Sequence, residues 1–194
     1  MEIEVVGHPL ELFKYCPRCG SPRFEVHNAK AKHCVACGFT YYFNPSAATV
    51  GVIVDGEGRL LVCRRAKEPA KGTLDLPGGF VDMYESNEEG MLREIREETG
   101  VRAVIDRFLF SLPNTYLYSG FLVHTTDNFF LCHLVDENEA IKGCDDATDL
   151  QWLYPEELCA ADFGLESIRR GIIKLKTEIL TDRDVPAGDK QAHR

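Results

Sequence analysis

Short apolar runs alternate with turn-forming residues along most of the chain, a pattern typical of strands separated by loops. The runs at 47–54 and 59–65 flank the turn Asp55-Gly56-Glu57-Gly58, which predicts a β-hairpin. Further strand-like runs follow at 102–111, 115–123, 128–135 and 149–154. The pattern therefore predicts a sheet-containing body that begins after residue 44.

Local signals predict two helices. Ser86 and Glu89 stand three residues apart, as in a capping box, and predict a helix over 87–99 that ends at Gly100. Apolar residues at helical spacing predict a second helix over about 162–181. We expect the polar segment 184–194 to be a frayed tail.

Four of the eight cysteines form two closely spaced pairs, Cys16 with Cys19 and Cys34 with Cys37. Two such pairs supply four thiolates to one tetrahedral Zn²⁺. Two disulfides are one alternative, disfavoured in a cytosolic chain, and a redox Cys-x-x-Cys motif is another, which does not explain two copies. A histidine ligand from His27 or His33 is a further alternative. We therefore predict a zinc ribbon within residues 1–44, a main domain over 45–183 and a tail over 184–194.

Composition and charge narrow the class of protein. The chain has 194 residues, 44% of them hydrophobic, and a net charge of −9, which is typical of a soluble protein and unsuited to wrapping nucleic acid. Residues 14–40 form a basic exception, with five Lys or Arg against one Glu. No apolar run approaches the roughly 20 residues of a membrane helix, and the start lacks a signal-peptide pattern. We expect a cytoplasmic protein without a membrane partner.

Three carboxylates share one side of the first predicted helix. At about 100° per residue, Glu97 and Glu98 fall within about 60° of Glu94. Like charges at these spacings repel each other, and a hard cation such as Mg²⁺ or Mn²⁺ removes that repulsion. The alternative is a solvated acidic face with Arg93 and Arg96 as local partners.

The surrounding residues favour the metal-binding interpretation. The segment reads Gly79, five residues, Glu85, seven residues, and then Arg-Glu-Ile-Arg-Glu-Glu-Thr-Gly-Val over 93–101. This resembles the signature of the Nudix hydrolases at every defined position. The resemblance implies an α/β fold, an α/β/α sandwich with a mixed sheet. It also implies hydrolysis, dependent on Mg²⁺ or Mn²⁺, of the diphosphate bond in a nucleoside diphosphate linked to another group.

The same resemblance implies roles for individual residues. The implied ligands of the catalytic metal are three carboxylates and one backbone carbonyl: Glu94, Glu97, Glu98 and Gly78. Glu85 is implied to pair with Arg93 and so to brace the loop against the helix. Either Glu94 or Glu97 is our candidate for the general base that takes a proton from water.

The predicted zinc ribbon ahead of a Nudix domain resembles the NADH pyrophosphatase branch of the family. That branch carries the array Ser-Gln-Pro-Trp-Pro-Phe-Pro-x-Ser eleven residues beyond the last glycine of the signature. Residues 111–119 here read Ser-Leu-Pro-Asn-Thr-Tyr-Leu-Tyr-Ser, so both serines, one proline and an aromatic position are kept. Tyr116 is a candidate to stack on a base, with a place in the core as the alternative. The lost positions leave NADH as an open question.

Four further residues are weaker candidates. Asp146 lies before Trp152 at the offset where the branch has an additional metal-binding carboxylate, and Asp149 is the next choice. Arg64 and Arg65 end the strand predicted over 59–65, where an arginine can contact a phosphate. Because side chains alternate along a strand, at most one of the two arginines should face the site.

Two classes of function follow. The first is a hydrolase acting on NADH, NAD⁺, ADP-ribose or a dinucleoside polyphosphate. The second is a nucleotide-sensing regulator whose zinc ribbon contacts nucleic acid. The intact signature favours the hydrolase, and a hydrolase of NAD-capped RNA combines the two. Relatives with a zinc module are often dimers, so the resemblance also implies a homodimer.

Overall fold

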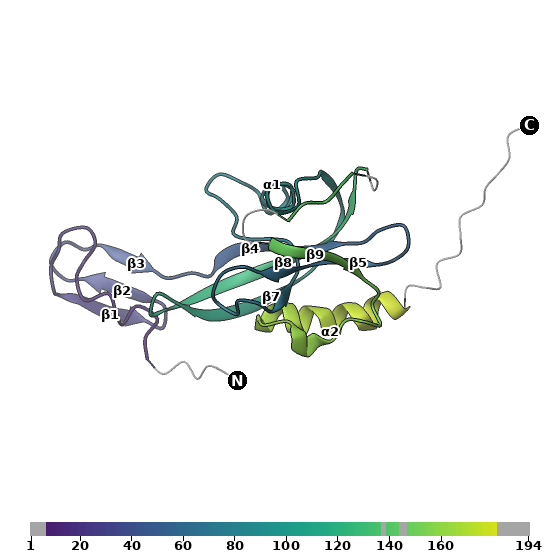
Figure 1. Cartoon of the computed structure of the whole chain (residues 1–194). Helices are drawn as coiled ribbons and strands as arrows, with labels where there is room; N and C mark the ends of the chain where they lie inside the picture. Colours follow the sequence, from purple (N-terminus) through teal and green to yellow (C-terminus); the bar gives the residue numbers. More distant parts are fainter. Residues whose placement is uncertain (1–6, 137–138, 144–146, 182–194) are drawn as a thin grey trace, which may run out of the picture.

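The computed structural model describes residues 7–136, 139–143 and 147–181. In chain order the elements are β1 (Phe24–Asn28), β2 (Ala31–Cys34), β3 (Thr40–Tyr42), β4 (Ser46–Ile53), β5 (Leu60–Arg65), β6 (Leu74–Asp75), α1 (Asn87–Thr99), β7 (Ala103–Tyr118), β8 (Phe121–Leu134), β9 (Ala147–Leu153), the 3-10 helix η1 (Ala160–Asp162) and α2 (Glu166–Thr181). Figure 1 shows an elongated molecule with β1, β2 and β3 at one end and α1 and α2 on opposite sides of the remaining strands.

The body contains two sheets of three strands each, in the orders β4-β8-β7 and β6-β5-β9. In the first sheet β4 runs parallel to β8, whereas β8 runs antiparallel to β7. One hydrophobic cluster contains residues of α1, and a second contains residues of α2. Phe129 and Phe130 are adjacent on β8 but belong to different clusters, because successive side chains point to opposite faces of a strand. The predicted α/β fold with a mixed sheet is confirmed.

The predicted hairpin of residues 47–54 and 59–65 is wrong. The turn is present, since the Gly58 amide donates to the Asp55 carbonyl at 2.9 Å and Val54 bridges to Leu60. Beyond that bridge the strands separate: β4 pairs with β8, and β5 pairs with β6 and β9. Most residues of both strands are buried. Strands that are buried in this way can pair with strands that lie far away in the sequence.

The strand predicted over 102–111 and the first part of the one predicted over 115–123 form a single strand, β7. A turn at Ser119 and Gly120 separates it from β8, which begins at Phe121. Pro113 lies within β7. Its missing N–H is tolerated because β7 is an edge strand of the order β4-β8-β7.

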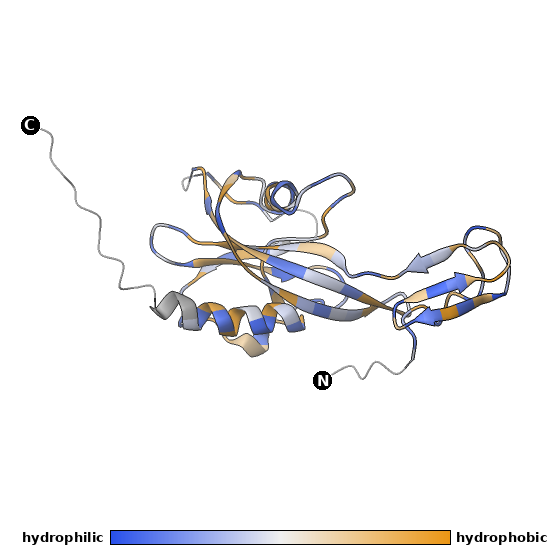
Figure 2. Cartoon of the chain, turned by 180° about the vertical axis from the view of Figure 1, so that it is seen from behind, coloured by the Kyte–Doolittle hydropathy of each residue, from blue (hydrophilic) through white to orange (hydrophobic). Residues whose placement is uncertain are grey.

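The helix bounds were predicted with different success. The helix expected over 87–99 is confirmed as α1. The second helix begins at Glu166 rather than near residue 162, because η1 lies before it. Apolar and polar residues alternate along α2 in Figure 2, as its contact with the sheet on one side requires. Among the described residues, neither helix combines the length and the apolar character needed to cross a membrane.

Residues that flank the small N-terminal sheet of β1, β2 and β3 contact the tip of the β7–β8 hairpin through aromatic rings. Phe121, at the start of β8, lies 5.7 Å from the ring of Phe13 and 5.3 Å from that of Phe43, both edge to face. His124 lies 5.6 Å from Phe43. Such pairs contribute about 0.5–1.5 kcal/mol each beyond their buried area. The long hairpin therefore connects the N-terminal sheet to the body.

Candidate active site

The ends of α1 are fixed by local interactions. The Ser86 hydroxyl accepts a hydrogen bond from the Glu89 amide at 3.2 Å, and the Glu89 carboxylate accepts one from the Ser86 amide at 2.8 Å. Gly100 adopts a left-handed conformation with φ of 76° and closes the helix onto the Arg96 carbonyl. The capping box and the glycine stop therefore set which residues of α1 face the rest of the site.

Arg93 connects α1 to the loop that precedes it. Its Nε and Nη2 donate to the two oxygens of Glu85 at 2.7 and 3.0 Å, and Nη2 also donates to the Phe80 carbonyl at 2.9 Å. Nη1 bridges Glu94 at 2.8 Å and Glu97 at 3.0 Å. These charged hydrogen bonds raise the pKa of Arg93, and its bond to Glu85 lowers the pKa of that carboxyl. One guanidinium therefore orients two carboxylates of α1.

The glycine pair before α1 brings the backbone close to the carboxylates. The Gly78 amide donates to Glu98 Oε2 at 2.9 Å. Gly78 has φ of 150°, and a Cβ there would overlap the Thr49 carbonyl oxygen. At Gly79 a Cβ would lie 2.6 Å from Glu94 Oε1. Both positions therefore need glycine: Gly78 for its backbone conformation, and Gly79 for the space that the Glu94 carboxylate occupies.

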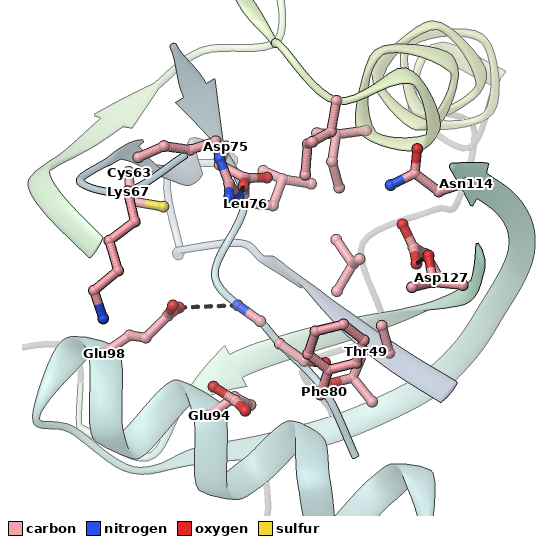
Figure 3. Close-up of a pocket in the computed structure, with 18 of the residues that line it drawn as sticks. Thr49, Cys63, Lys67, Asp75, Leu76, Phe80, Glu94, Glu98, Asn114 and Asp127 are labelled. Atoms are coloured by element: carbon pink, nitrogen blue, oxygen red, sulfur yellow. Dashed lines mark hydrogen bonds and ion pairs between the residues drawn. The ribbon is translucent and has the colours of Figure 1, made fainter. Parts of the chain in front are cut away.

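A cavity of about 340 Å³ opens beside these groups, a size typical of small-ligand sites. Glu94 and Glu98 lie on the α1 side in Figure 3, and Asn114 and Asp127 lie on the opposite side. Of the residues singled out from the sequence, six line this cavity: Gly78, Glu94, Glu97, Glu98, Arg65 and Tyr116. The structure therefore brings most of the predicted site together in one place.

Burial changes the acidity of two groups in the cavity. The side chain of Glu94 is 16% exposed, and its desolvation raises the pKa of the carboxyl, although Arg93 opposes the shift. Asp75 is deeply buried, and desolvation likewise raises the pKa of its carboxyl against the opposing effect of the adjacent Arg65 guanidinium. Both carboxyls therefore hold a proton more readily than a solvent-exposed carboxyl does.

The four N-terminal cysteines fit a zinc site. None is in a disulfide, and all four Sγ atoms lie within 4.8 Å of one another. The Cys16–Cys37 and Cys19–Cys34 Sγ distances are 3.7 and 3.6 Å, close to the about 3.8 Å expected for tetrahedral ligands with Zn–S bonds of about 2.3 Å. The ring of His33 instead contacts the Thr40 hydroxyl. The geometry thus favours four cysteine ligands without histidine.

The carboxylates of α1 have the oxygen chemistry that Mg²⁺ and Mn²⁺ prefer. Among the described residues, the four cysteines are the one group of three or more His, Cys, Asp or Glu side chains whose donor atoms all lie within 4.8 Å of one another. The three glutamates are less tightly grouped, because Arg93 holds Glu94 and Glu97 while the Gly78 amide holds Glu98. The carboxylate oxygens suit a hard cation, which would replace some of their hydrogen bonds to Arg93 and to the Gly78 amide.

The weaker predictions have different outcomes. Arg64 does not line the cavity: its guanidinium donates to the Gly72 carbonyl and lies 3.7 Å from the exposed Asp149. Arg65, on the other face of β5, does line it. Asp149 is correspondingly placed away from the cavity, on the surface. Asp146 lies outside the described residues.

Sequence reasoning missed several residues of the cavity. Asp75, Asn114 and Asp127 are at most 7% exposed and all line it. Asn114 and Asp127 each stand beside a threonine, so their burial leaves no local signal. Asp75 stands between two leucines, and a polar residue buried in that way needs a partner. That signal was available in the sequence, in the run Leu-Asp-Leu before the glycine pair. Lys67 also lines the cavity.

The NUDIX domain family model matches residues 45–175. The chain belongs to the NUDIX family. The match covers both sheets of the body, α1 and most of α2, so the Nudix fold accounts for the elements that surround the cavity. The four cysteines lie before the matched region.

Two curated relatives show what this Nudix chain is similar to. It is 41% identical over 140 residues to an ADP-ribose pyrophosphatase of Methanocaldococcus jannaschii, covering 71% of this chain and 79% of that protein. It is 32% identical over 96 residues to the NAD-capped RNA hydrolase NudC of Stutzerimonas stutzeri, covering 50% of this chain. This chain spans only 34% of the length of that NudC protein.

A solved structure supports the fold. The Nudix hydrolase from Nitrosomonas europaea superposes with a TM-score of 0.69 at 21% identity, and the alignment covers 87% of this chain and 93% of that one. At this identity the likeness concerns the arrangement of strands and helices, and the chemistry of the site has to be argued from its own residues.

Proposed function

We propose that this protein hydrolyses the diphosphate linkage of a nucleoside diphosphate joined to another group. The observation that carries the proposal is the meeting of Glu94, Glu97 and Glu98 with the Gly78 backbone at one wall of a ligand-sized cavity. Arg65 on the same cavity supplies a positive charge of the kind that contacts phosphate oxygens.

The proposed cofactor is Mg²⁺ or Mn²⁺, held by Glu94, Glu97, Glu98 and the Gly78 carbonyl. Bound there, such an ion offsets the negative charge of the diphosphate and lowers the pKa of water. Glu94 or Glu97 is the proposed general base that takes a proton from this water. Arg93 keeps Glu94 and Glu97 oriented, and Glu85 in turn fixes Arg93.

The proposed substrate class includes ADP-ribose, NADH or NAD⁺ and dinucleoside polyphosphates. The 41% identical relative named ADP-ribose pyrophosphatase supports placing ADP-ribose first. NAD-capped RNA is a further candidate, supported by the NudC relative over the shorter alignment. The zinc ribbon over 1–44, the Nudix domain over 45–183, a homodimer and a cytoplasmic location belong to the same proposal.

The test is a hydrolysis panel with Mg²⁺ and with Mn²⁺. Its substrates are ADP-ribose, NADH, NAD⁺, diadenosine polyphosphates, nucleoside triphosphates and NAD-capped RNA, and Glu97→Gln serves as the inactive reference. We expect wild type to exceed Glu97→Gln by at least about 100-fold on one compound. Equal rates on every compound would overturn the proposal. Gel-shift binding of nucleic acid without turnover would then favour the regulator.

A further inference from the structure

One buried side chain in the cavity has an unsatisfied hydrogen-bonding atom. Asn114 on β7 is 5% exposed, and its Oδ1 has no hydrogen-bond partner among the described residues. Leaving a buried acceptor unpaired costs about 1–3 kcal/mol. Since Asn114 lines the cavity, a bound molecule with an N–H or O–H donor would remove that cost.

Asp127 adds a second acceptor group beside Asn114. In the β7–β8 register Asn114 lies opposite Thr125, two residues from Asp127, so both side chains lie on one face of the pair. Asp127 is 5% exposed, and its carboxylate accepts hydrogen bonds from the hydroxyls of Thr125 and Ser167. Those two partners are neutral. This end of the cavity therefore favours hydrogen-bond donors over acceptors.

The rest of the cavity wall limits the shape of the donor. Four apolar side chains also line it: Val50, Leu76, Leu165 and Ile168. Tyr116 adds a partly buried ring. Apolar walls with a few polar groups at one end suit a flat aromatic ring that carries a polar edge. They suit a ribose less well, because its hydroxyl groups would face apolar carbon.

A nucleobase is the flat ring that the proposed substrates contain, and the bases differ in their edges. An asparagine amide presents an acceptor beside a donor, which matches the exocyclic amine and N7 of adenine. Hypoxanthine has a carbonyl oxygen in place of that amine. Next to Asn114 Oδ1 and the Asp127 carboxylate, this oxygen would face acceptors and leave them unpaired.

We propose that Asn114, assisted by the charge of Asp127, reads the exocyclic amine of an adenine base and so selects adenine nucleotides. This proposal rests on the proposed function, which places the diphosphate next to Glu94 and Glu98. Those two residues lie across the cavity from Asn114 and Asp127 (Figure 3). It adds a specificity-determining residue that the Nudix signature does not contain.

The test compares AMP with IMP by isothermal titration calorimetry on the full chain with Mg²⁺. These ligands share the ribose and the phosphate, and they differ at the 6-position that Asn114 is proposed to read and at the adjoining N1, which carries a proton in IMP. We expect AMP to bind at least about 10-fold tighter than IMP, in line with the cost of an unpaired buried acceptor. Asn114→Leu should bring the two affinities within about 2-fold. Thr115→Val, next to it on the opposite face of β7, should keep the wild-type preference.

A stability measurement separates recognition from a structural role. Because Oδ1 of Asn114 has no partner in the described chain, Asn114→Leu should keep or raise the melting temperature. A fall of more than about 5 °C would indicate a structural role and overturn the assignment. Equal affinities of wild type for AMP and IMP, or binding of neither, would also overturn it. So would a preference for AMP that Asn114→Leu retains.

Two further arms complete the test. The 2′-deoxy form of AMP should bind like AMP, and a loss confined to that compound would show that the ribose is read instead. The binding assay needs no turnover. A preference for AMP in a protein that hydrolyses nothing would therefore overturn the proposed function alone. Hydrolysis of ADP-ribose and of its hypoxanthine analogue at equal rates would overturn the adenine assignment alone.

Discussion

A single methyl group at Gly79 should disable the site while leaving the fold intact. A Cβ at this position would lie 2.6 Å from Oε1, 2.7 Å from Cδ and 2.8 Å from Oε2 of Glu94. The backbone of Gly79 has no positive φ that would forbid alanine, in contrast to Gly78. In Gly79→Ala the flexible carboxylate of Glu94 must therefore move, whereas the backbone need not.

The size of the effect follows from that contact. Ordinary contacts begin near 3.4 Å, so the Glu94 carboxylate must retreat by roughly 0.8 Å, against the pull of Arg93. Misplacing a reacting group by about 1 Å can cost about 100-fold in rate. We expect kcat/KM to fall about 100-fold, or about 2.7 kcal/mol. Because alanine restricts the unfolded chain, the melting temperature should stay within about 4 °C of wild type.

The assay is steady-state hydrolysis of the best compound of the substrate panel, with thermal unfolding of the same preparations. Gly90→Ala on α1 is the matched control, because its Cβ would meet no atom nearer than 3.3 Å and alanine favours helix. It should keep activity within about threefold. If Gly79→Ala folds and matches Gly90→Ala in kcat/KM, the position of Glu94 does not matter, and the reasoning fails.

Three other changes have defined outcomes. Purified under reducing conditions, the protein should contain one zinc ion per chain, and Cys34→Ser should lose it. Metal analysis that finds no zinc in wild type would contradict the four-cysteine site. Arg93→Lys should cost about 2 kcal/mol in urea unfolding, because lysine cannot bond Glu85 through two nitrogens; a loss below about 0.5 kcal/mol would contradict the bracing role. Burial raises the pKa of Asp75 above its ordinary 3.8, so folding favours its protonated form. The contribution of Asp75 protonation to the free energy of unfolding is complete below pH 3.8 and is lost as the pH rises through the pKa of Asp75 in the folded protein. Wild type should thus gain stability relative to Asp75→Asn as pH falls from about 7 toward about 4, and a constant difference would refute this.

Features fixed by neighbouring residues were predictable from the sequence. The bounds of α1 follow from Ser86, Glu89 and Gly100, whose contacts all lie within a few residues. The cysteine pairs likewise predicted a group that the structure brings within 4.8 Å. In each case the signal is local, so no knowledge of the tertiary fold was needed.

Features that depend on distant partners were not predictable in the same way. The residues on either side of the turn at Asp55 show the pattern of a hairpin. In the structure β4 instead pairs with β8, more than 70 residues away in the sequence. The runs at 102–111 and 115–123 were predicted as separate strands, but β7 continues from the first into the second because it pairs with β8 over this stretch. Asn114 and Asp127 face the cavity because of the β7–β8 register and the packing of α2, neither of which a periodic pattern specifies.

The proposed hydrolysis depends on the carboxylates of α1 binding a divalent cation beside the cavity. Anomalous diffraction from crystals soaked in Mn²⁺ measures this directly. We predict a manganese peak about 2.2 Å from oxygens of Glu94, Glu97 or Glu98 and near the Gly78 carbonyl, and its loss in Glu97→Gln crystals. A protein that hydrolyses its substrate with Mn²⁺ but shows no peak at these oxygens would contradict the account.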